Sequence, residues 1–461
     1  MKTSEDTIAA IATAAGEGGI SVIRVSGPES LKVADRVFRC SEPPPSRRKG
    51  GTFVHGYVMG PSSDQVPAPD IDEALLLIFR APHSYTREDI VEIQGHGGSI
   101  SAQRILRRLL DSGARLAEPG EFTKRAFLNG RIDLVQAEAV LDLIRASSDR
   151  AATAAVEQLN GALSDWCATS YANILSLITA LEAALDFADD EMPPLLISEK
   201  AIQAKALLAN LMNMLSTWNE GHILRDGALT VISGKPNVGK STLFNALLGV
   251  DRSIVADLPG TTRDTIEENL LLDGVLLRLV DTAGLRSTDC DVESQGVLRA
   301  RSQIEKADLH IHVLDASQQL SDADRLELNS LPPERTIVVL NKADLGMMIR
   351  PSDIAKYPII SGSLLNRGDV HNLRTTLAGA LAKYTIGPVR VTISERHRQI
   401  ILAAVKNVSD ASNLLSESSE DALVPAVSLL RSAAEDLAAL TGRTYYDDLL
   451  EQIFSRFCIG K

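Results

Sequence analysis

One glycine-rich segment, residues 234–241, constrains the fold of this chain more than any other feature. It reads Gly-Lys-Pro-Asn-Val-Gly-Lys-Ser, follows the short apolar run 228–233 and precedes the helical pattern 242–248. This strand, loop and helix order is the context that a phosphate-binding loop requires. The glycines let backbone N–H groups surround phosphate oxygens, Lys240 can reach the β- and γ-phosphates, and the Ser241 hydroxyl can bind Mg²⁺. We therefore expect an α/β domain that binds a nucleotide.

Three further short motifs follow in an order that indicates guanine rather than adenine. Asp281 begins Asp-Thr-Ala-Gly after the apolar run 275–280, and an aspartate there can hold Mg²⁺ through water. Thr262, in the loop before it, offers the metal a second hydroxyl. Asp344 closes Asn-Lys-Ala-Asp after the apolar run 336–340, where a carboxylate can accept both N–H groups of the guanine edge. Adenine would leave that charge unpaired, at about 1–3 kcal/mol. Together the motifs predict a GTPase.

The residue after the Asp-Thr-Ala-Gly motif departs from the Ras pattern. Ras-like enzymes place a glutamine there to orient the attacking water, and this chain has Leu285, which cannot donate or accept a hydrogen bond. Either hydrolysis is very slow, or another group and another cation supply the missing function. The candidates, each of which could equally be a solvated loop residue, are Glu293, Asp289, Asp291, Arg286 and Arg263.

Composition limits the class of protein. A net charge of −13 argues against a general nucleic-acid coating protein. The four cysteines are far apart and have no metal-ligand spacing, which suits a reducing cytosol. We see neither a signal peptide nor an uninterrupted apolar run of about 20 residues, so we expect a cytoplasmic protein without a membrane span.

The 461 residues suffice for roughly three domains of about 150 residues. Because helical stretches flank the strand-helix block that holds the phosphate loop, we expect an inserted domain. The fold prediction is multidomain: an N-terminal α+β domain (1–121), an α-helical domain in two parts (122–220 and 385–461), and an inserted α/β P-loop, Ras-like GTPase domain (221–384). In the first domain we expect strands at 20–25, 74–79 and 90–93 and helices at 29–38 and 99–111, and after it one long helix over 137–186.

Motifs along the whole chain resemble those of the tRNA-modification GTPase family MnmE, also called TrmE. The N-terminal part carries Asp6-Thr7-Ile8-Ala9-Ala10, the run Gln94-Gly95-His96-Gly97-Gly98, and Pro119-Gly120-Glu121-Phe122-Thr123-Lys124-Arg125. The chain ends with Phe457-Cys458-Ile459-Gly460-Lys461, the C-terminal signature of that family.

The resemblance implies a function that composition does not show. Members work with a flavoprotein partner, MnmG (GidA), in a heterotetramer-type complex. Together they install an aminomethyl-type (carboxymethylaminomethyl) group on C5 of the wobble uridine of certain tRNAs. A tetrahydrofolate derivative, 5-formyl- or 5,10-methylene-tetrahydrofolate, supplies the one-carbon unit, and GTP hydrolysis is required. The N-terminal domain forms a homodimer and binds folate, and the GTPase domains pair when GTP and K⁺ are bound.

The resemblance also assigns residues around the nucleotide. K⁺ would be held by Asn237, the carbonyls of Ala256 and Leu258, and Thr261, while Ser241 and Thr262 would hold Mg²⁺. Glu293 matches the water-orienting acid and acts with Lys240, which leaves Asp289 and Asp291 as solvated residues. The full expected GTP set is Asn237, Val238, Gly239, Lys240, Ser241, Thr242, Ala256, Asp257, Leu258, Pro259, Gly260, Thr261, Thr262, Asp281, Thr282, Ala283, Gly284, Asn341, Lys342, Asp344, Ser361, Gly362 and Ser363.

Members of the family usually have Ser-Ala-Lys where this chain has Ser361-Gly362-Ser363. Gly362 still offers a backbone N–H to the guanine carbonyl, so we expect guanine recognition to survive with a looser loop.

The implied folate site consists of Arg24, Glu92, Arg131 and Lys461. Arg24 falls on an apolar strand, where an arginine needs an anionic partner unless it lies in water at a strand end. Cys458 is either the catalytic thiol proposed for the family or a packed structural cysteine.

Contact with tRNA could use Arg104, Arg107 and Arg108 or the run Arg47-Arg48-Lys49, although such charges are more often simply solvated. The alternative function is a regulatory GTPase of ribosome assembly, similar to Era or Der. Those proteins share the middle block but lack the N-terminal block and the C-terminal signature.

Overall fold

The computed structural model describes residues 6–61, 69–186, 194–249, 267–281, 307–385, 391–417 and 420–461. The chain forms two compact units. One consists of Met1–Leu141, Ser164–Leu175 and Ala434–Lys461, and the other consists of Asp142–Leu163 and Ser176–Ala433. The residues predicted at 256–262, 282–286, 289, 291 and 293, together with Arg263, lie outside the described residues.

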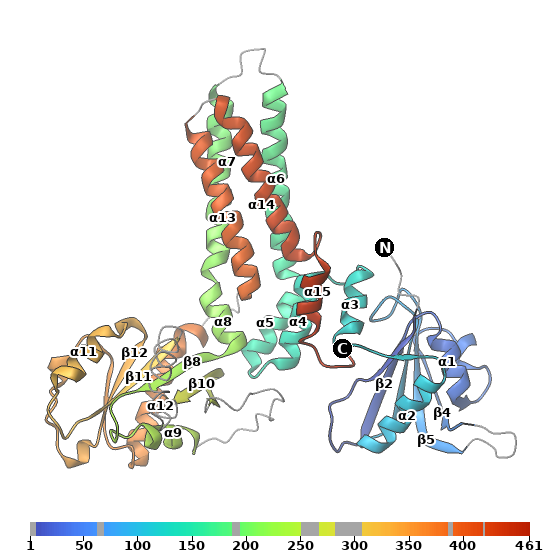
Figure 1. Cartoon of the computed structure of the whole chain (residues 1–461), viewed down its shortest axis with the longest axis horizontal. Helices are drawn as coiled ribbons and strands as arrows, with labels where there is room; N and C mark the ends of the chain where they lie inside the picture. Colours follow the sequence, from blue (N-terminus) through green and yellow to red (C-terminus); the bar gives the residue numbers. More distant parts are fainter. Residues whose placement is uncertain are drawn as a thin grey trace, which may run out of the picture. The chain divides into compact units, whose positions relative to one another are not determined.

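The first unit contains a seven-stranded sheet in the order β3-β4-β5-β6-β2-β1-β7. Its strands are β1 (Ile8–Ile11), β2 (Ile20–Ser26), β3 (Phe38–Cys40), β4 (Thr52–Met59), β5 (Asp70–Phe79), β6 (Ile90–His96) and β7 (Arg115–Leu116). Helices α1 (Ser30–Val37) and α2 (Ser99–Asp111) pack against one face, as Figure 1 shows. This α+β domain confirms the predicted class. Its elements contain the three predicted strands and the predicted helix 99–111, and α1 matches the predicted helix 29–38 to within one residue at each end.

The opposite face of this sheet carries the alternate residues of each strand. Phe53 on β4 is 70% exposed and Leu75 on β5 is 38% exposed. One row runs directly across four strands, from Phe53 to Leu77, then to Glu92, then to Arg24. At the far end of that row Phe122, from α3 (Glu121–Leu128), packs with Ile8 and Ala10 of β1. Arg24 and Glu92, two of the four predicted folate residues, therefore lie on the face of the sheet opposite α1 and α2.

A buried arginine ties α3 to this sheet. The Arg125 side chain is 4% exposed and donates hydrogen bonds to three carboxylates, those of Asp6, Glu88 and Glu121. Glu121 also accepts from Arg115. Burial alone would raise the pKa of Glu121, but the hydrogen bonds from Arg115, Glu118 N–H and Arg125 lower it instead.

We expect Arg125→Met to lower the free energy of unfolding by about 3–5 kcal/mol, because it leaves buried carboxylates without their cation. Arg115→Met is the matched control. Its side chain is 43% exposed, so the loss should stay near or below about 1 kcal/mol. Urea unfolding of the two variants measures the difference, and equal losses would show that burial of Arg125 is unimportant.

The predicted single helix over 137–186 is wrong, because the segment forms three helices. They are α4 (Leu134–Arg145), α5 (Asp149–Leu159) and α6 (Ala162–Asp186). Ser148 starts α5 because its side chain accepts a hydrogen bond from the N–H of Ala151. Gly161, with φ of 100°, then separates α5 from α6.

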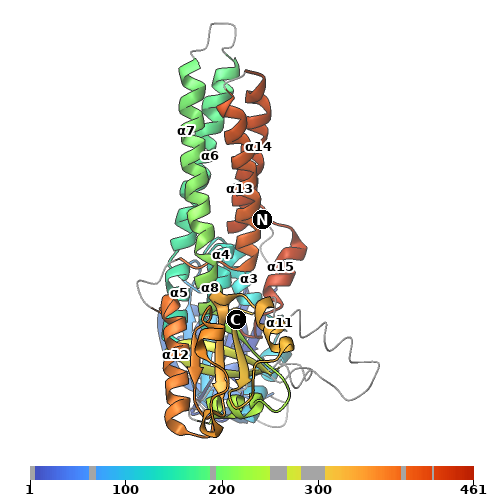
Figure 2. The same ribbon diagram turned by 90° about the vertical axis from the view of Figure 1, so that its left-hand side faces the viewer.

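Further helices follow: α7 (Pro194–Ser216), α8 (Trp218–Asp226), α13 (Glu395–Ser416), α14 (Leu423–Thr441) and α15 (Asp447–Phe454). Helices α7 and α13 pack along each other, as Figures 1 and 2 both show. The Cys167 thiol on α6 donates to the Leu437 carbonyl of α14 at 3.2 Å, and Arg431 of α14 pairs with Glu182 of α6.

Among the described helices, α6 alone is long and apolar enough to cross a membrane by length and composition. A core helix passes the same test, and Ile174, Leu177 and Leu181 of α6 are buried inside the protein.

The second unit contains a six-stranded sheet in the order β13-β12-β11-β8-β10-β9. Its strands are β8 (Ala228–Ser233), β9 (Glu267–Leu272), β10 (Val275–Asp281), β11 (Leu309–Asp315), β12 (Thr336–Asn341) and β13 (Ile359–Ser361). Neighbouring strands are parallel except for β9 with β10. Helices α9 (Lys240–Leu248) and α12 (Arg367–Thr385) contribute Leu243, Leu247, Leu373 and Leu377 to one core with this sheet, and α11 (Asp322–Ser330) contributes Leu328 to a second cluster.

Candidate functional site

The carboxyl ends of the parallel strands bring the predicted nucleotide residues to one edge of the sheet. Strand β8 leads into the phosphate loop, β10 ends at Asp281, and β12 ends at Asn341. Ligands of open parallel sheets bind outside these ends. The side chain of Asp281 is not among those described, but its backbone pairs with Ile232, two residues before the loop begins.

Two glycines of the phosphate loop are required because neighbouring atoms leave no room for a side chain. Gly234 has φ of 132°, and a Cβ there would lie 2.3 Å from the Val313 carbonyl oxygen. Gly239 has φ of 109°, and a Cβ there would lie 2.2 Å from Asn341 Nδ2. Any larger residue at either position would displace the loop from the sheet.

Lys240 lies at the mouth of the loop, at the first residue of α9. It is 8% exposed, and its ammonium donates to the carbonyls of Gly234 at 2.8 Å and Lys235 at 2.6 Å. Ser241 and Thr242 follow in the first turn of the helix and are exposed. The N-terminus of a helix and a lysine at its start favour a phosphate group.

A second lysine of the loop is held by α11, which we did not predict. Lys235 Nζ donates to Ser321 Oγ at 2.6 Å and to Asp324 Oδ2 at 2.9 Å, and these two residues form the capping box of α11. Both acceptors are about 85–90 residues downstream, so no local sequence signal could have revealed the contact. The pairing fixes the position of the loop backbone next to Pro236.

Beneath the loop, His312 bonds through Nδ1 to Ser233 Oγ at 2.9 Å. Burial lowers the pKa of His312 to about 4, so the imidazole is neutral at pH 7 and adds no charge to the phosphate region.

At the predicted guanine end, Asn341 acts as a bridge. Its Nδ2 donates to the Val238 carbonyl at 2.8 Å, and its Oδ1 accepts from the Leu364 N–H at 3.0 Å. The side chain therefore joins the phosphate loop to the loop after β13. Asp344 lies three residues further along and is exposed, so its carboxylate is accessible to a base.

Lys342, next to Asn341, adopts a left-handed backbone conformation with φ of 63° and donates to Asp315 Oδ2 at 2.7 Å. Burial would raise the pKa of Asp315, but the hydrogen bonds from Lys342 and Ser317 lower it, so the carboxylate stays charged. The ion pair holds the lysine over the end of β11.

The Gly362 N–H, which we expected to meet the guanine carbonyl, is instead bonded within the protein. The Gly362 N–H donates to the Leu340 carbonyl at 3.0 Å, and the Ser363 N–H donates to Asp369 Oδ2 at 2.8 Å. A Cβ at Gly362 would lie 2.6 Å from Asp369 Cγ. The glycine therefore makes room for a carboxylate that ties the loop to α12.

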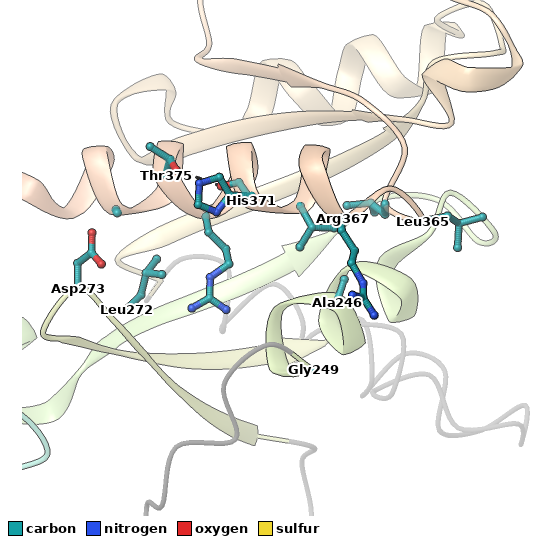
Figure 3. A pocket seen from close by; sticks show the side chains of 12 residues that line it. Ala246, Gly249, Leu272, Asp273, Leu365, Arg367, His371 and Thr375 are labelled. Atoms are coloured by element: carbon teal, nitrogen blue, oxygen red, sulfur yellow. Dashed lines mark hydrogen bonds between the residues drawn. The ribbon is translucent and has the colours of Figure 1, made fainter.

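A cavity of about 890 Å³ lies beside this region, between α9, α12 and the turn that joins β9 to β10 (Figure 3). Arg367, His371 and Arg374 of α12 line it together with Asp273 of the turn. Its lining, as far as the described residues go, includes none of the predicted nucleotide residues.

The four predicted folate residues lie together in the first unit. Arg24 Nε donates to Glu92 Oε1 at 2.8 Å, and each side chain is 16% exposed. The carboxylate is the anionic partner that we expected for Arg24. The Arg24 guanidinium also lies 5.3 Å from the ring centre of Tyr85 and 5.6 Å from that of Phe122.

Arg131 and Lys461 complete this cluster. Arg131 donates to the Tyr85 carbonyl at 3.0 Å, and its guanidinium lies 4.8 Å from the same ring. Burial and the charge of Arg24 lower the pKa of Lys461, against an opposing effect of Glu92. The C-terminal segment reaches the cluster by packing on β1, where a Cβ at Gly460 would lie 2.2 Å from the Ile11 carbonyl oxygen.

The structure also describes Cys458 and the basic residues that could contact tRNA. Cys458 is exposed, so the alternative of a packed structural cysteine is wrong. Arg48 donates to the Ser41 carbonyl, and Arg108 donates to the Met59 carbonyl, so both have structural contacts rather than purely solvated charges. The exposed side chains of the two runs are Arg47, Lys49, Arg104 and Arg107.

Comparison with known proteins extends this description to the whole chain. Residues 7–131 match the family model of the GTP-binding protein TrmE N-terminus, and residues 134–458 match that of the MnmE helical domain. A protein of Pediococcus pentosaceus named tRNA modification GTPase MnmE is 42% identical over 475 residues, covering 100% of this chain and 99% of the relative. The protein of the same name from Geobacillus thermodenitrificans is 42% identical over 473 residues and is covered completely.

Solved structures match a smaller part of the chain. Aquifex aeolicus Era, bound to GDP and AlF₄⁻, is 26% identical over 39% of this chain and 66% of its own, with a TM-score of 0.27. The G domain of the T. maritima FeoB iron transporter is 25% identical over 34% of this chain and 99% of its own, with a TM-score of 0.25. The two family models and the full-length relatives show that the chain belongs to the MnmE (TrmE) family of tRNA modification GTPases.

Proposed function

We propose that this GTPase takes part in the C5 modification of wobble uridines in tRNA, with a tetrahydrofolate derivative as one-carbon donor. The observation that carries the proposal is the cluster of Arg24, Glu92, Arg131 and Lys461 on the N-terminal sheet. It lies apart in sequence from every nucleotide motif, so it indicates a second ligand. The names of the full-length relatives favour tRNA modification over ribosome assembly.

The chemistry of the cluster fits a folate. Glu92 can accept N–H groups of a pterin ring, and the guanidiniums of Arg24 and Arg131 can bind the carboxylates of a glutamate tail. The pair Arg24 and Glu92 is largely buried, which strengthens such contacts. Cys458, exposed and three residues before Lys461, is accessible to react. We therefore assign this cluster as the folate site.

Two metal ions would serve the GTPase site. Ser241, exposed in the first turn of α9, and Thr262 would hold Mg²⁺. Asn237, which is exposed with φ of 64°, would bind K⁺ together with Thr261 and the carbonyls of Ala256 and Leu258. An exposed amide oxygen on a loop that also carries phosphate donors suits a monovalent cation. Such an ion supplies positive charge near the phosphates, where other GTPases use an arginine.

The open face of the N-terminal sheet suits a homodimer. Phe53 is 70% exposed and Leu75 is 38% exposed, and Phe53 lies in the same cross-strand row as Glu92 and Arg24. Exposed apolar patches of this kind mark contact surfaces. A second copy on this face would place its surface beside the folate cluster. We propose that a flavoprotein of the MnmG type then binds the dimer and contributes many of the contacts with tRNA.

Mass analysis of tRNA nucleosides from a strain that lacks this gene tests the proposal. We expect loss of the C5 modification at wobble uridines and its return when the gene is restored. Unchanged wobble uridines would contradict the proposed function and would favour a regulatory role.

A further inference from the structure

We propose that Tyr85 is the positioning residue of the anion end of the N-terminal cluster, and that it holds Arg24 and Arg131 ready for the carboxylates of a folate tail. The inference rests on the proposed function, because it names a determinant of the same site. Tyr85 lies in the loop between β5 and β6, whereas the two arginines come from β2 and from the turn after α3.

The Tyr85 ring contacts both guanidiniums at once. Their central carbons lie 5.3 Å and 4.8 Å from the ring centre. Two neighbouring guanidiniums repel each other. The face of an aromatic ring attracts a cation, so it offsets part of this repulsion. The ring therefore gathers two positive groups without consuming their N–H donors, which a carboxylate in the same place would do.

The hydrogen bonds of the two arginines leave donors available. Within the described part of the chain, Arg24 donates through Nε to Glu92, and Arg131 donates through Nη1 to the Tyr85 carbonyl. A guanidinium has five N–H donors, so most of them remain for a ligand. The ligand class that uses several such donors in one plane is a carboxylate or phosphate, and the two carboxylates of a glutamate tail match two guanidiniums.

Tyr85 is itself fixed in place. Its hydroxyl shares a hydrogen bond of 2.9 Å with Thr123 Oγ1 on α3, and its ring packs against the cluster of Ile8, Ala10 and Phe122. The side chain is partly exposed, so it is not simply a core residue. Because the ring contacts the arginines and the hydroxyl bonds to Thr123, the two parts of the side chain can be tested separately.

The test is binding of 5-formyl-tetrahydrofolate to the full chain, compared with a 5-formyl-tetrahydropterin that lacks the aminobenzoyl-glutamate tail. Tyr85→Leu should weaken binding of the folate about tenfold or more, because two cation–π contacts are lost. It should leave binding of the tail-free pterin nearly unchanged. Tyr85→Phe keeps the ring and should bind the folate within about twofold of the original chain, as should Thr123→Val.

Two results would overturn the inference. Folate affinity unchanged in Tyr85→Leu would show that the ring does not position the arginines. Equal weakening of both ligands would show a general structural role for Tyr85, whereas retained binding of the tail-free pterin by Tyr85→Leu excludes unfolding as the cause of a selective loss. If the original chain binds neither ligand, the folate assignment itself fails and this inference fails with it.

Discussion

Asp344→Asn is expected to weaken GTP binding by about 10²–10⁴-fold. The carboxylate of Asp344 is exposed beyond the end of β12, and in our assignment it accepts two N–H groups of guanine. Hydrogen bonds to a charged group contribute about 1.5–3 kcal/mol each, so loss of both corresponds to that range of affinity. Because the side chain is exposed, the substitution should not affect folding.

The same substitution should change which base is preferred. An asparagine offers one acceptor and one donor, and xanthine presents a carbonyl where guanine presents its amino group. We therefore expect the variant to bind xanthosine triphosphate more tightly than GTP, reversing the order of the original chain. Titration with fluorescent analogues of both nucleotides measures the reversal.

Asp353→Asn is the matched control, since Asp353 is an exposed aspartate of the same domain outside the motif. It should bind GTP normally. If Asp344→Asn also binds GTP normally, guanine is recognised elsewhere and the assignment of the motif is wrong.

Glu293→Ala should bind GTP normally and hydrolyse it about 10²-fold more slowly or worse. Leu285 occupies the position from which Ras-like enzymes orient water with a glutamine, and the family resemblance gives that role to Glu293. A positioned acid or base contributes about 10²–10⁴-fold. Single-turnover hydrolysis, measured separately from nucleotide affinity, distinguishes a lost chemical step from lost binding. Asp289→Ala, four residues earlier, is the control that should keep its rate.

The same assay in NaCl instead of KCl tests the cation. If K⁺ at Asn237 supplies the missing positive charge, turnover of the original chain should fall by at least about tenfold in NaCl. Equal rates in the two salts would remove the K⁺ site. Normal hydrolysis by Glu293→Ala, in the test above, would show that Glu293 does not orient the attacking water.

Much of the fold could be predicted from sequence because its signals are local. The runs 228–233, 275–280 and 336–340 become β8, β10 and β12 nearly residue for residue. Strand β4 was not predicted, since Gly56 interrupts its apolar pattern. The structure explains that glycine, because a Cβ there would lie 2.2 Å from the Arg39 carbonyl oxygen of the neighbouring strand β3.

The error in the helical region has a different cause. Alanine and leucine continue the helical pattern through residues 137–186, so periodicity alone does not separate the three helices. The boundaries depend on Ser148 and Gly161, which act through a single cap and a single left-handed turn. Such single-residue signals carry little weight beside a pattern of many residues.

The candidate sites likewise combine motifs that can be read from the sequence with contacts that only the folded chain creates. The nucleotide motifs are contiguous, and their described residues meet at one edge of the sheet. By contrast, the contacts of Lys235 with Asp324, Asn341 with Val238, and Ser363 with Asp369 follow no sequence pattern. The folate cluster was named through the family resemblance, and only the structure shows that the ring of Tyr85 lies against both of its arginines.

In our proposal, GTP hydrolysis by this chain drives a tRNA modification. Its most direct test is the C5 modification of wobble uridines, measured by mass spectrometry in a strain that lacks the gene and carries either the original chain or Glu293→Ala. We predict that the original chain restores the modification and that the variant, present at equal abundance and able to bind GTP, does not. Restoration by a variant that cannot hydrolyse GTP would contradict the account.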